Sequence, residues 1–167
     1  MLRSARKRCL AAVCLALGAL AVGLPAHASS SSGTFVRLID NGNSMCMGVS
    51  GGVMTNGRPV IQWPCNGHDD QYWQWDGGNP HVLKDFKDPT KCLDGSGQFH
   101  TGPLVINTCN GSTYQQWTYI DPNFSGKGYL QNVGTGGYAT GVLGQGVQVD
   151  QYNGSPVPNW PFQLWSS

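Results

Sequence analysis

The sequence predicts an all-β domain, a closed barrel or sandwich made of twelve short strands. Three observations predict it. First, the chain has 24 Gly and 10 Pro among its 167 residues, so turns are frequent. Second, only 11% of its residues are charged and none is Glu, whereas an average protein has roughly 25% charged residues and solvated helices need them. Third, one set of landmarks occurs three times along the chain.

The first 28 residues are predicted to be a secretory signal peptide. Basic residues open the chain, an uncharged apolar run follows over 9–24, and Ala26-His27-Ala28 supplies the small-x-small pattern that precedes cleavage. The alternative is a transmembrane anchor, but 16 apolar residues fall short of the roughly 20 that span a bilayer. We therefore expect cleavage near Ala28-Ser29, a secreted protein, and a flexible lead-in over 29–33.

The chain without this leader is weakly acidic. It has 139 residues with 6 Lys and Arg against 9 Asp, which gives a net charge of −3. A nucleic-acid partner would require a basic excess, so none is expected, and no further run is apolar enough to span a membrane. A chain of this length can bury one core. We expect a single domain over 34–167.

Each copy of the repeat ends in Gln-x-Trp, and the three Trp residues lie 44 and 48 positions apart. Upstream of that motif comes a Cys-Asn-Gly or Tyr-Asn-Gly turn, and before the turn another Cys or Tyr. Landmarks that keep one order and one period define three copies, over 34–79, 80–125 and 126–167. In chain order the landmarks are Cys46, Cys65 and Trp73; Cys92, Cys109 and Trp117; Tyr138, Tyr152 and Trp165.

Short stretches of β-branched and aromatic residues fill each copy. Turn pairs such as Asn41-Gly42, Asn56-Gly57 and Asp121-Pro122 separate them. No window of 11 residues shows the apolar period of a helix. The predicted strands are 34–40, 45–49, 59–65 and 71–76 in the first copy; 81–86, 91–94, 104–109 and 115–120 in the second; 129–133, 138–142, 147–152 and 162–165 in the third.

The four Cys residues outside the leader predict two disulfides. An even number of Cys in an exported chain favours disulfides. Of the three possible pairings, only Cys46–Cys65 with Cys92–Cys109 treats both copies alike, and each bridge is worth roughly 3 kcal/mol in the chain-entropy model. The alternatives are free buried thiols or a zinc site, but the chain has no Cys-x-x-Cys or His-x-x-x-His spacing. We expect no metal and no cofactor.

These blocks resemble a known repeat. Cys46-Met47-Gly48, the segment 61–67 and Gln71-Tyr72-Trp73, with their counterparts in the second copy, are similar to the repeat of ricin B-chain type lectins, also classed as carbohydrate-binding module family 13. The resemblance covers about 34–167. It implies a β-trefoil, in which three four-stranded units form a six-stranded barrel capped by hairpins. It also implies binding of sugars, commonly galactosides or xylan.

The resemblance implies a structural role for the Gln-x-Trp motif. In the family, the Trp of this motif packs in the core around a pseudo-threefold axis. We therefore expect Trp73, Trp117 and Trp165 to be buried, with Gln163 at the motif position of the third copy. The two Tyr landmarks of the third copy are expected to replace the missing disulfide by packing.

The resemblance also places one shallow sugar site on each copy. An acidic side chain two residues after the first Cys accepts hydrogen bonds from two hydroxyls. An aromatic ring two residues before the second Cys stacks on the pyranose. An amide side chain just before the motif Gln completes the contacts, and the first copy has Asp70 at this position. No copy has the full set.

The first two copies retain different parts of that set. The first has the ring of Trp63 but Gly48 at the acid position, and the second has the acid Asp94 but no ring. The third has Thr140 and Asp150 at these two positions. Three structural alternatives remain open: Trp63 as a surface aromatic, Asp70 in a solvated turn, and Asp94 as a turn cap. The candidate carbohydrate-binding residues are Trp63, Asp70, Gln71, Asp94, Asn107 and Gln115.

An enzyme is not expected. The segment Gly48-Val49-Ser50-Gly51-Gly52 matches Gly-x-Ser-x-Gly, but that motif has a mechanical meaning only at a strand-to-helix elbow. Glycoside hydrolysis requires a positioned pair of carboxylates, and no pair in the sequence qualifies. The alternative to a lectin is a sugar-silent trefoil that serves as a protein-binding, toxin-subunit or inhibitor module. The expected partners are glycans or glycoconjugates, or else a protein that docks on a contiguous patch of exposed aromatics, for which the candidates are Trp63, Tyr72, Trp75 and Trp160.

Overall fold

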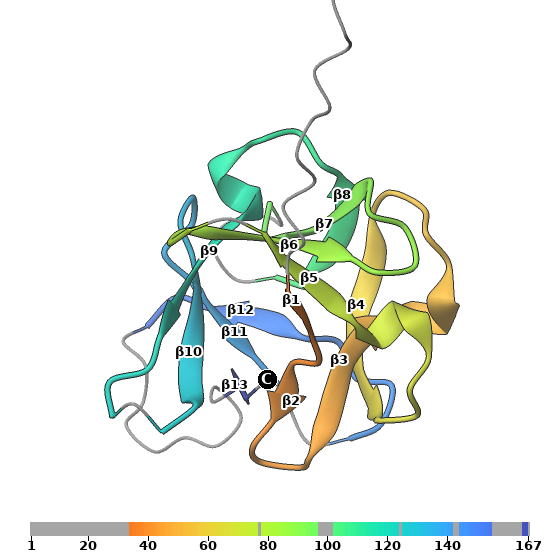
Figure 1. Cartoon of the computed structure of the whole chain (residues 1–167), viewed down its shortest axis with the longest axis horizontal. Coiled ribbons are helices and arrows are strands. Elements are labelled where there is room, and N and C mark those ends of the chain that lie inside the picture. Colours follow the sequence, from red (N-terminus) through yellow and green to blue (C-terminus); the bar gives the residue numbers. More distant parts are fainter. Residues whose placement is uncertain are drawn as a thin grey trace, which may run out of the picture. The chain divides into compact units, whose positions relative to one another are not determined.

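The computed structural model describes residues 34–76, 78–96, 102–123, 125–141, 144–154 and 165–166. The predicted signal peptide and lead-in lie outside these residues. No helix in the described part is long and apolar enough to cross a membrane. The strands are β1 Thr34–Val36, β2 Ile39–Asp40, β3 Met45–Val49, β4 Arg58–Pro64, β5 Trp73–Asp76, β6 His81–Asp85, β7 Lys91–Asp94, β8 Val105–Thr108, β9 Gln116–Ile120, β10 Lys127–Asn132, β11 Tyr138–Thr140, β12 Asp150–Tyr152 and β13 Trp165–Ser166 (Figure 1).

The strands pair in the same way in each copy. Antiparallel hairpins join β3 to β4, β7 to β8 and β11 to β12. A closed ring of backbone hydrogen bonds links the three copies: Val60 N–H donates to the carbonyl of Leu104 (2.8 Å), Leu104 to Val149 (2.7 Å), and Val149 to Val60 (2.9 Å). This ring marks a pseudo-threefold axis, as the predicted β-trefoil requires.

The predicted strands are found with shifted ends. The first prediction, 34–40, is divided into β1 and β2. The strands predicted from 71 and 115 begin later, because Gln71 and Gln115 lie in the 3-10 turns η2 (Asp69–Gln71) and η4 (Thr113–Gln115). A similar turn, η1 (Ser50–Gly52), follows β3. Of the last predicted strand, 162–165, only Trp165 lies among the described residues.

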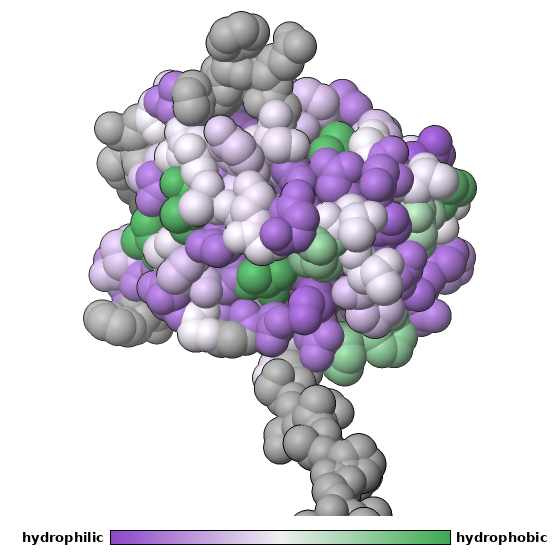
Figure 2. Space-filling model, turned by 90° about the horizontal axis from the view of Figure 1, so that it is seen from above, coloured by the Kyte–Doolittle hydropathy of each residue, from purple (hydrophilic) through white to green (hydrophobic). Residues whose placement is uncertain are grey.

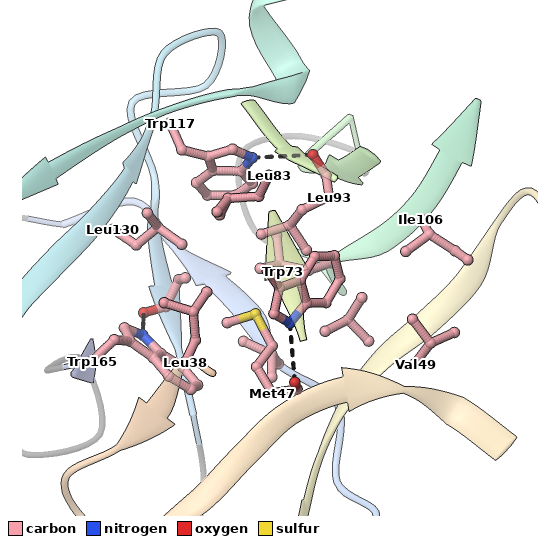
Figure 3. Packing of buried hydrophobic residues seen from close by; sticks show 14 residues of the cluster. Leu38, Met47, Val49, Trp73, Leu83, Leu93, Ile106, Trp117, Leu130 and Trp165 are labelled. Carbon is pink, nitrogen blue, oxygen red and sulfur yellow. Dashed lines mark hydrogen bonds between the residues drawn. The ribbon is translucent and has the colours of Figure 1, made fainter. Parts of the chain in front are cut away.

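The motif Trp residues form the centre of the core, as expected. All three are fully buried in one apolar cluster. Figure 3 shows how each indole N–H donates to the carbonyl of the residue after the first Cys or Tyr landmark: Trp73 to Met47 (3.1 Å), Trp117 to Leu93 (3.0 Å) and Trp165 to Ala139 (3.0 Å). A buried indole N–H needs a partner, and a carbonyl of the same copy supplies it each time. Gln163 lies outside the described residues.

Both predicted disulfides are present, and each closes within its own copy. Cys46 is bonded to Cys65 with 5.1 Å between Cα atoms, and Cys92 to Cys109 with the same separation. The first Cys of each pair is fully buried and the second lies at the surface. Each bridge therefore ties the end of a hairpin to the turn that precedes the Gln-x-Trp motif.

Tyr152 corresponds to another position of the repeat than the sequence spacing predicts. Strand pairing sets Tyr152 opposite Tyr138, as Trp63 is set opposite Cys46 and Asn107 opposite Cys92. Tyr152 therefore corresponds to the sugar-stacking position and not to the second Cys, two residues later. Tyr138 packs against Tyr129, with 6.1 Å between ring centroids. The motif spacing misaligned the third copy, because hydrogen-bond register and not sequence distance sets the facing pairs.

Candidate functional site

A cavity of about 510 Å³ opens on the first copy and unites two of the predicted site residues. Trp63 and Asp70 both line it, together with turn η1. Lys87 from the second copy and Gly146 from the third also reach it. We call this space the first-copy cavity. Its walls thus come from all three copies, although its ring and its acid belong to the first.

Trp63 lies near the end of β4, which the Cys46–Cys65 bridge ties to β3. Its side chain is 38% exposed, and so its ring is open to a ligand. Gly146 passes close to the ring: a Cβ at this glycine would lie 3.5 Å from Trp63 Cζ3. The Gly146 N–H donates to the carbonyl of Gln62 (2.7 Å), which holds that loop beside the indole.

Asp70 brings a carboxylate next to the position where the first copy lacks its acid. Turn η2 packs directly on Gly48 of β3, and a Cβ at that glycine would lie 3.4 Å from Asp70 Oδ2. The side chain of Asp70 accepts no hydrogen bond from any described residue. Its oxygens are therefore free to accept bonds from ligand hydroxyls. Because Gly48 has no side chain, the carboxylate of Asp70 can lie beside the position where the family has its acid. The first copy therefore has an acid at a shifted position.

Gln71 and Gln115 are buried and serve the scaffold. In the first copy, Gln71 Oε1 accepts from the N–H of Asn66 (3.0 Å) and its Nε2 donates to the carbonyl of Pro64 (3.0 Å). In the second, Gln115 accepts from Asn110 N–H (2.8 Å) and donates to the carbonyl of Thr108 (3.1 Å). Both amides therefore hold the Cys-Asn-Gly turn in place. For Gln71, predicted to bind sugar, these two bonds occupy both polar atoms.

The second copy brings its three candidates together as an internal network. Asp94 is 3% exposed and accepts three hydrogen bonds, from Asn107 Nδ2 (3.1 Å), Gln115 Nε2 (2.9 Å) and Ser96 N–H (2.7 Å). Asn107 stands where Trp63 stands in the first copy, so no ring faces the acid. The carboxylate of Asp94 is thus committed to the fold, in contrast to that of Asp70.

The third copy has a ring without an acid. Tyr152 is 40% exposed at the stacking position, but Thr140 occupies the acid position and is buried. Asp150 lies directly opposite Thr140, and burial raises the pKa of its carboxyl group. Phe162, which precedes the motif Gln here, lies outside the described residues.

Two of the aromatics expected to form a protein-docking patch, Trp63 and Trp75, line different cavities. Trp63 lines the first-copy cavity, whereas Trp75 packs against His81 (4.5 Å between centroids) and Tyr119 (5.8 Å) beside a second, mainly apolar cavity of about 340 Å³. Arg37 covers the ring of Tyr72 at 5.7 Å. On the face drawn in Figure 2, hydrophobic residues form small separate patches. The fourth named aromatic, Trp160, lies outside the described residues.

Sequence reasoning missed two nitrogen-bearing side chains of the first-copy cavity. Lys87 and His68 both line it. His68 precedes η2 in the first copy, but Lys87 follows β6 in the second copy and reaches across to η1, where its ammonium group donates to the carbonyl of Gly52 (2.8 Å). The family pattern gives no signal for Lys87, because it describes residues within one copy.

A sequence model of the ricin-type beta-trefoil lectin domain matches residues 34–135, more than half of the chain. The chain belongs to this lectin family. Members of the family are carbohydrate-binding domains, typically non-catalytic, so membership supports carbohydrate binding at the level of the family. The matched region contains the whole first and second copies, including both disulfides and the first-copy cavity except Gly146.

Relatives and solved structures agree with the lectin fold. The chain is 32% identical over 100 residues to a probable alpha-galactosidase A of Aspergillus clavatus, which covers 60% of this chain but only 17% of that enzyme. The designed 3-fold symmetric protein ThreeFoil superposes with a TM-score of 0.71 and 22% identity, over 79% of this chain and 96% of ThreeFoil. The Macrolepiota procera ricin B-like lectin in complex with lactose superposes with a TM-score of 0.66 and 16% identity, over 81% of this chain and 95% of the lectin. The β-trefoil expected from the sequence is thereby confirmed.

Proposed function

We propose that this lectin domain binds a sugar in the first-copy cavity. Trp63 stacks on the apolar face of a pyranose, and Asp70 accepts hydrogen bonds from two neighbouring hydroxyls. One observation carries the proposal: a single cavity presents an exposed indole together with a carboxylate that has no hydrogen-bond donor among the described residues. No catalytic step is proposed for this pair.

A galactoside is the first ligand to test, and a xylan fragment the second. The alpha-galactosidase relative and the lactose complex of the similar lectin both favour galactosides. The cavity is open and offers one ring and one acid, so a single site should bind weakly, with a Kd on the order of 1 mM. Useful avidity would then come from several sites presented together.

The test is a calorimetric titration of the protein with methyl galactoside, lactose and xylobiose, supported by a glycan array. Trp63→Ala and Asp70→Asn should each weaken binding roughly tenfold or more, because each removes one of the two ligand-contacting groups. Tyr114→Ala and Asp69→Asn are matched controls, since Tyr114 is 41% exposed and neither residue lines the cavity. Wild-type protein that binds no sugar on the array would refute the proposal.

We further propose that the protein acts outside the cell. The leader over 1–28 supports export, and two disulfides are typical of oxidising compartments. The check is fractionation of the producing cells followed by N-terminal sequencing. Mature protein in the medium that begins at Ser29 is the expected result, whereas uncleaved protein retained in the cell would contradict it.

A second candidate function, docking of a protein partner, is favoured by one aromatic group that sequence analysis did not single out as a whole. Phe35 and Phe86 are 48% and 42% exposed and meet edge to face at 4.7 Å, and Tyr72 lies 6.3 Å from Phe86. Exposed aromatics of this kind are enriched in interfaces. Phe86→Ala should weaken such a complex and leave the sugar titration unchanged.

A further inference from the structure

We propose that the first-copy cavity selects an anionic sugar, such as a uronic acid, over its neutral counterpart. The inference rests on the proposed function, since it names the ligand class of the same cavity. It depends on Lys87, a residue of the second copy whose ammonium group lies in the wall of a cavity built mainly by the first.

The charged ends of Lys87 and Asp70 both lie close to Gly52 in the wall of the cavity. A Cβ at Gly52 would lie 3.0 Å from the ammonium nitrogen of Lys87 and 3.5 Å from Asp70 Oδ1. The ammonium group is held there by its hydrogen bond to the Gly52 carbonyl. A ligand that reaches this wall of the cavity therefore meets a hydrogen-bonding acid and a fixed cation next to each other.

Lys87 forms no ion pair with any described residue. Among those residues the one ion pair joins Lys84 to Asp76 at 2.6 Å, and no carboxylate oxygen lies within 4.0 Å of the Lys87 ammonium group. An ammonium group has three donors, and Lys87 uses one of them on the Gly52 carbonyl. The other two remain for a ligand in the cavity.

A second cation lies behind the same turn. Arg58 donates from Nε to the carbonyl of Ser50 (2.6 Å), and a Cβ at Gly51 would lie 3.1 Å from its Nη2. Turn η1 is therefore flanked by Lys87 at one end and by Arg58 at the other. These two cations oppose the negative charge of Asp70 and favour an anionic group at that end of the cavity.

The two charges of the cavity define what a ligand must carry. Asp70 repels an anion and accepts hydroxyl protons, whereas Lys87 attracts the anion. A uronic acid satisfies both groups on one ring, because its carboxylate is separate from its neighbouring hydroxyls. A neutral sugar satisfies Asp70 alone. The expected gain is that of a partly exposed ion pair, a preference of roughly fivefold at low salt.

The experiment compares methyl galacturonoside with methyl galactoside by calorimetric titration at low and at high salt. We expect the galacturonoside to bind roughly fivefold more tightly at low salt, with a smaller preference at high salt because the pair is screened. Lys87→Gln should bring the ratio of the two Kd values to about one, and Lys87→Glu should invert it. Lys127→Gln, which changes an exposed lysine outside the cavity, should keep the wild-type ratio.

The outcomes separate the two proposals. Equal affinity for both sugars in the wild-type protein, or a preference that survives Lys87→Gln, overturns the anionic selectivity and leaves sugar binding in place. Binding of neither sugar overturns the proposed function and the selectivity with it. Tighter wild-type binding of methyl galactoside than of methyl galacturonoside, lost in Trp63→Ala, would assign the cavity to neutral sugars.

Discussion

The side-chain amide of Gln62 donates a hydrogen bond to the buried carboxylate of Asp40. The other oxygen of Asp40 accepts from the N–H of Gly42 (2.6 Å), so this fully buried acid is satisfied on both sides. In the third copy Asn132 corresponds to Asp40 and Gln151 to Gln62, but no hydrogen bond joins these two side chains. Asn132 Nδ2 donates to the carbonyl of Tyr114 (2.7 Å), and Gln151 Nε2 donates to the carbonyl of Gly95 (2.6 Å). In both copies the buried residue that caps the turn is hydrogen-bonded.

The second copy lacks that amide. Asp85 corresponds to Asp40 and caps its turn through Lys87 N–H (2.8 Å), but Ile106 occupies the place of Gln62. Asp85 Oδ2 is buried and has no hydrogen-bond partner among the described residues. Burial raises the pKa of Asp85 to about 7, and the nearby carboxylate of Asp70 adds to the rise. The fold therefore favours the protonated form of Asp85 at every pH below about 7.

Asp85→Asn should stabilise the domain at alkaline pH. The pKa of Asp85 is about 7 in the fold, against 3.8 for a free side chain, so the stability that its proton supplies is complete below about pH 4. It is lost as the pH rises through 7, by up to about 4 kcal/mol at roughly 1.4 kcal/mol per unit. The variant should therefore be more stable than wild type at pH 8, and the difference should fall at pH 4.

Urea denaturation from pH 4 to pH 8 measures this difference. Asp88→Asn is the control, because Asp88 lies in the same turn and its hydrogen bonds with Thr90 hold the pKa of its carboxyl group below the usual value. Its replacement should not raise stability at pH 8. If the Asp85→Asn variant is no more stable than wild type at pH 8, the charge of buried Asp85 does not destabilise the fold.

Gly141→Ala should destabilise the domain through the Asp40–Gln62 pair. A Cβ at Gly141 would overlap both side chains, which are themselves fully buried and cannot move away. Overpacking of this kind costs roughly 1–3 kcal/mol. Gly78→Ala is the control, since nothing lies within 4 Å of its added Cβ. Equal thermal midpoints for the two variants would show that the pair does not need this glycine.

The two disulfides should have similar effects on stability and different effects on binding. Replacing both Cys of either pair by Ala removes a loop of similar length, 19 or 17 residues, and should cost roughly 3 kcal/mol. Loss of Cys46–Cys65 also frees the strand end that carries Trp63, so sugar binding should weaken. Loss of Cys92–Cys109 should spare it. Sugar binding is measured by titration well below the thermal midpoint of each variant. Equal losses of affinity in the two variants would show that Cys46–Cys65 has no special role in holding Trp63.

The fold could be predicted from the sequence because its main supports repeat. Trp73 and Trp117 recur with their Gln and Cys neighbours at one spacing, and burial, disulfides and the three-fold arrangement all follow from that repeat. The alignment was wrong in the third copy, where the Cys landmarks are missing. There the position of Tyr152 depends on the pairing of β11 with β12, which sequence distance does not determine.

The site was only partly predictable, since its decisive features are relations between distant residues. Trp63 and Asp70 could be named from one copy, and the structure does bring them to one cavity. The Asp70 carboxylate is placed by the packing of its turn against Gly48, and the cation Lys87 comes from another copy. Likewise, the unsatisfied oxygen of Asp85 is visible only once Ile106 is seen to correspond to Gln62. A residue pattern within one repeat describes none of these relations.

Asp70 and Asp94 should respond in opposite ways to truncation. Asp70→Ala removes a carboxylate that accepts no hydrogen bond from the described residues, so stability should change by less than about 0.5 kcal/mol while sugar binding falls. Asp94→Ala leaves three donors without their buried acceptor, which should cost roughly 1–3 kcal/mol or more. Below its lowered midpoint, the Asp94 variant should still bind sugar in the first-copy cavity. Thermal denaturation and calorimetric titration of both variants give the two readings. Loss of binding in Asp94→Ala with an unchanged midpoint would move the site to the second copy.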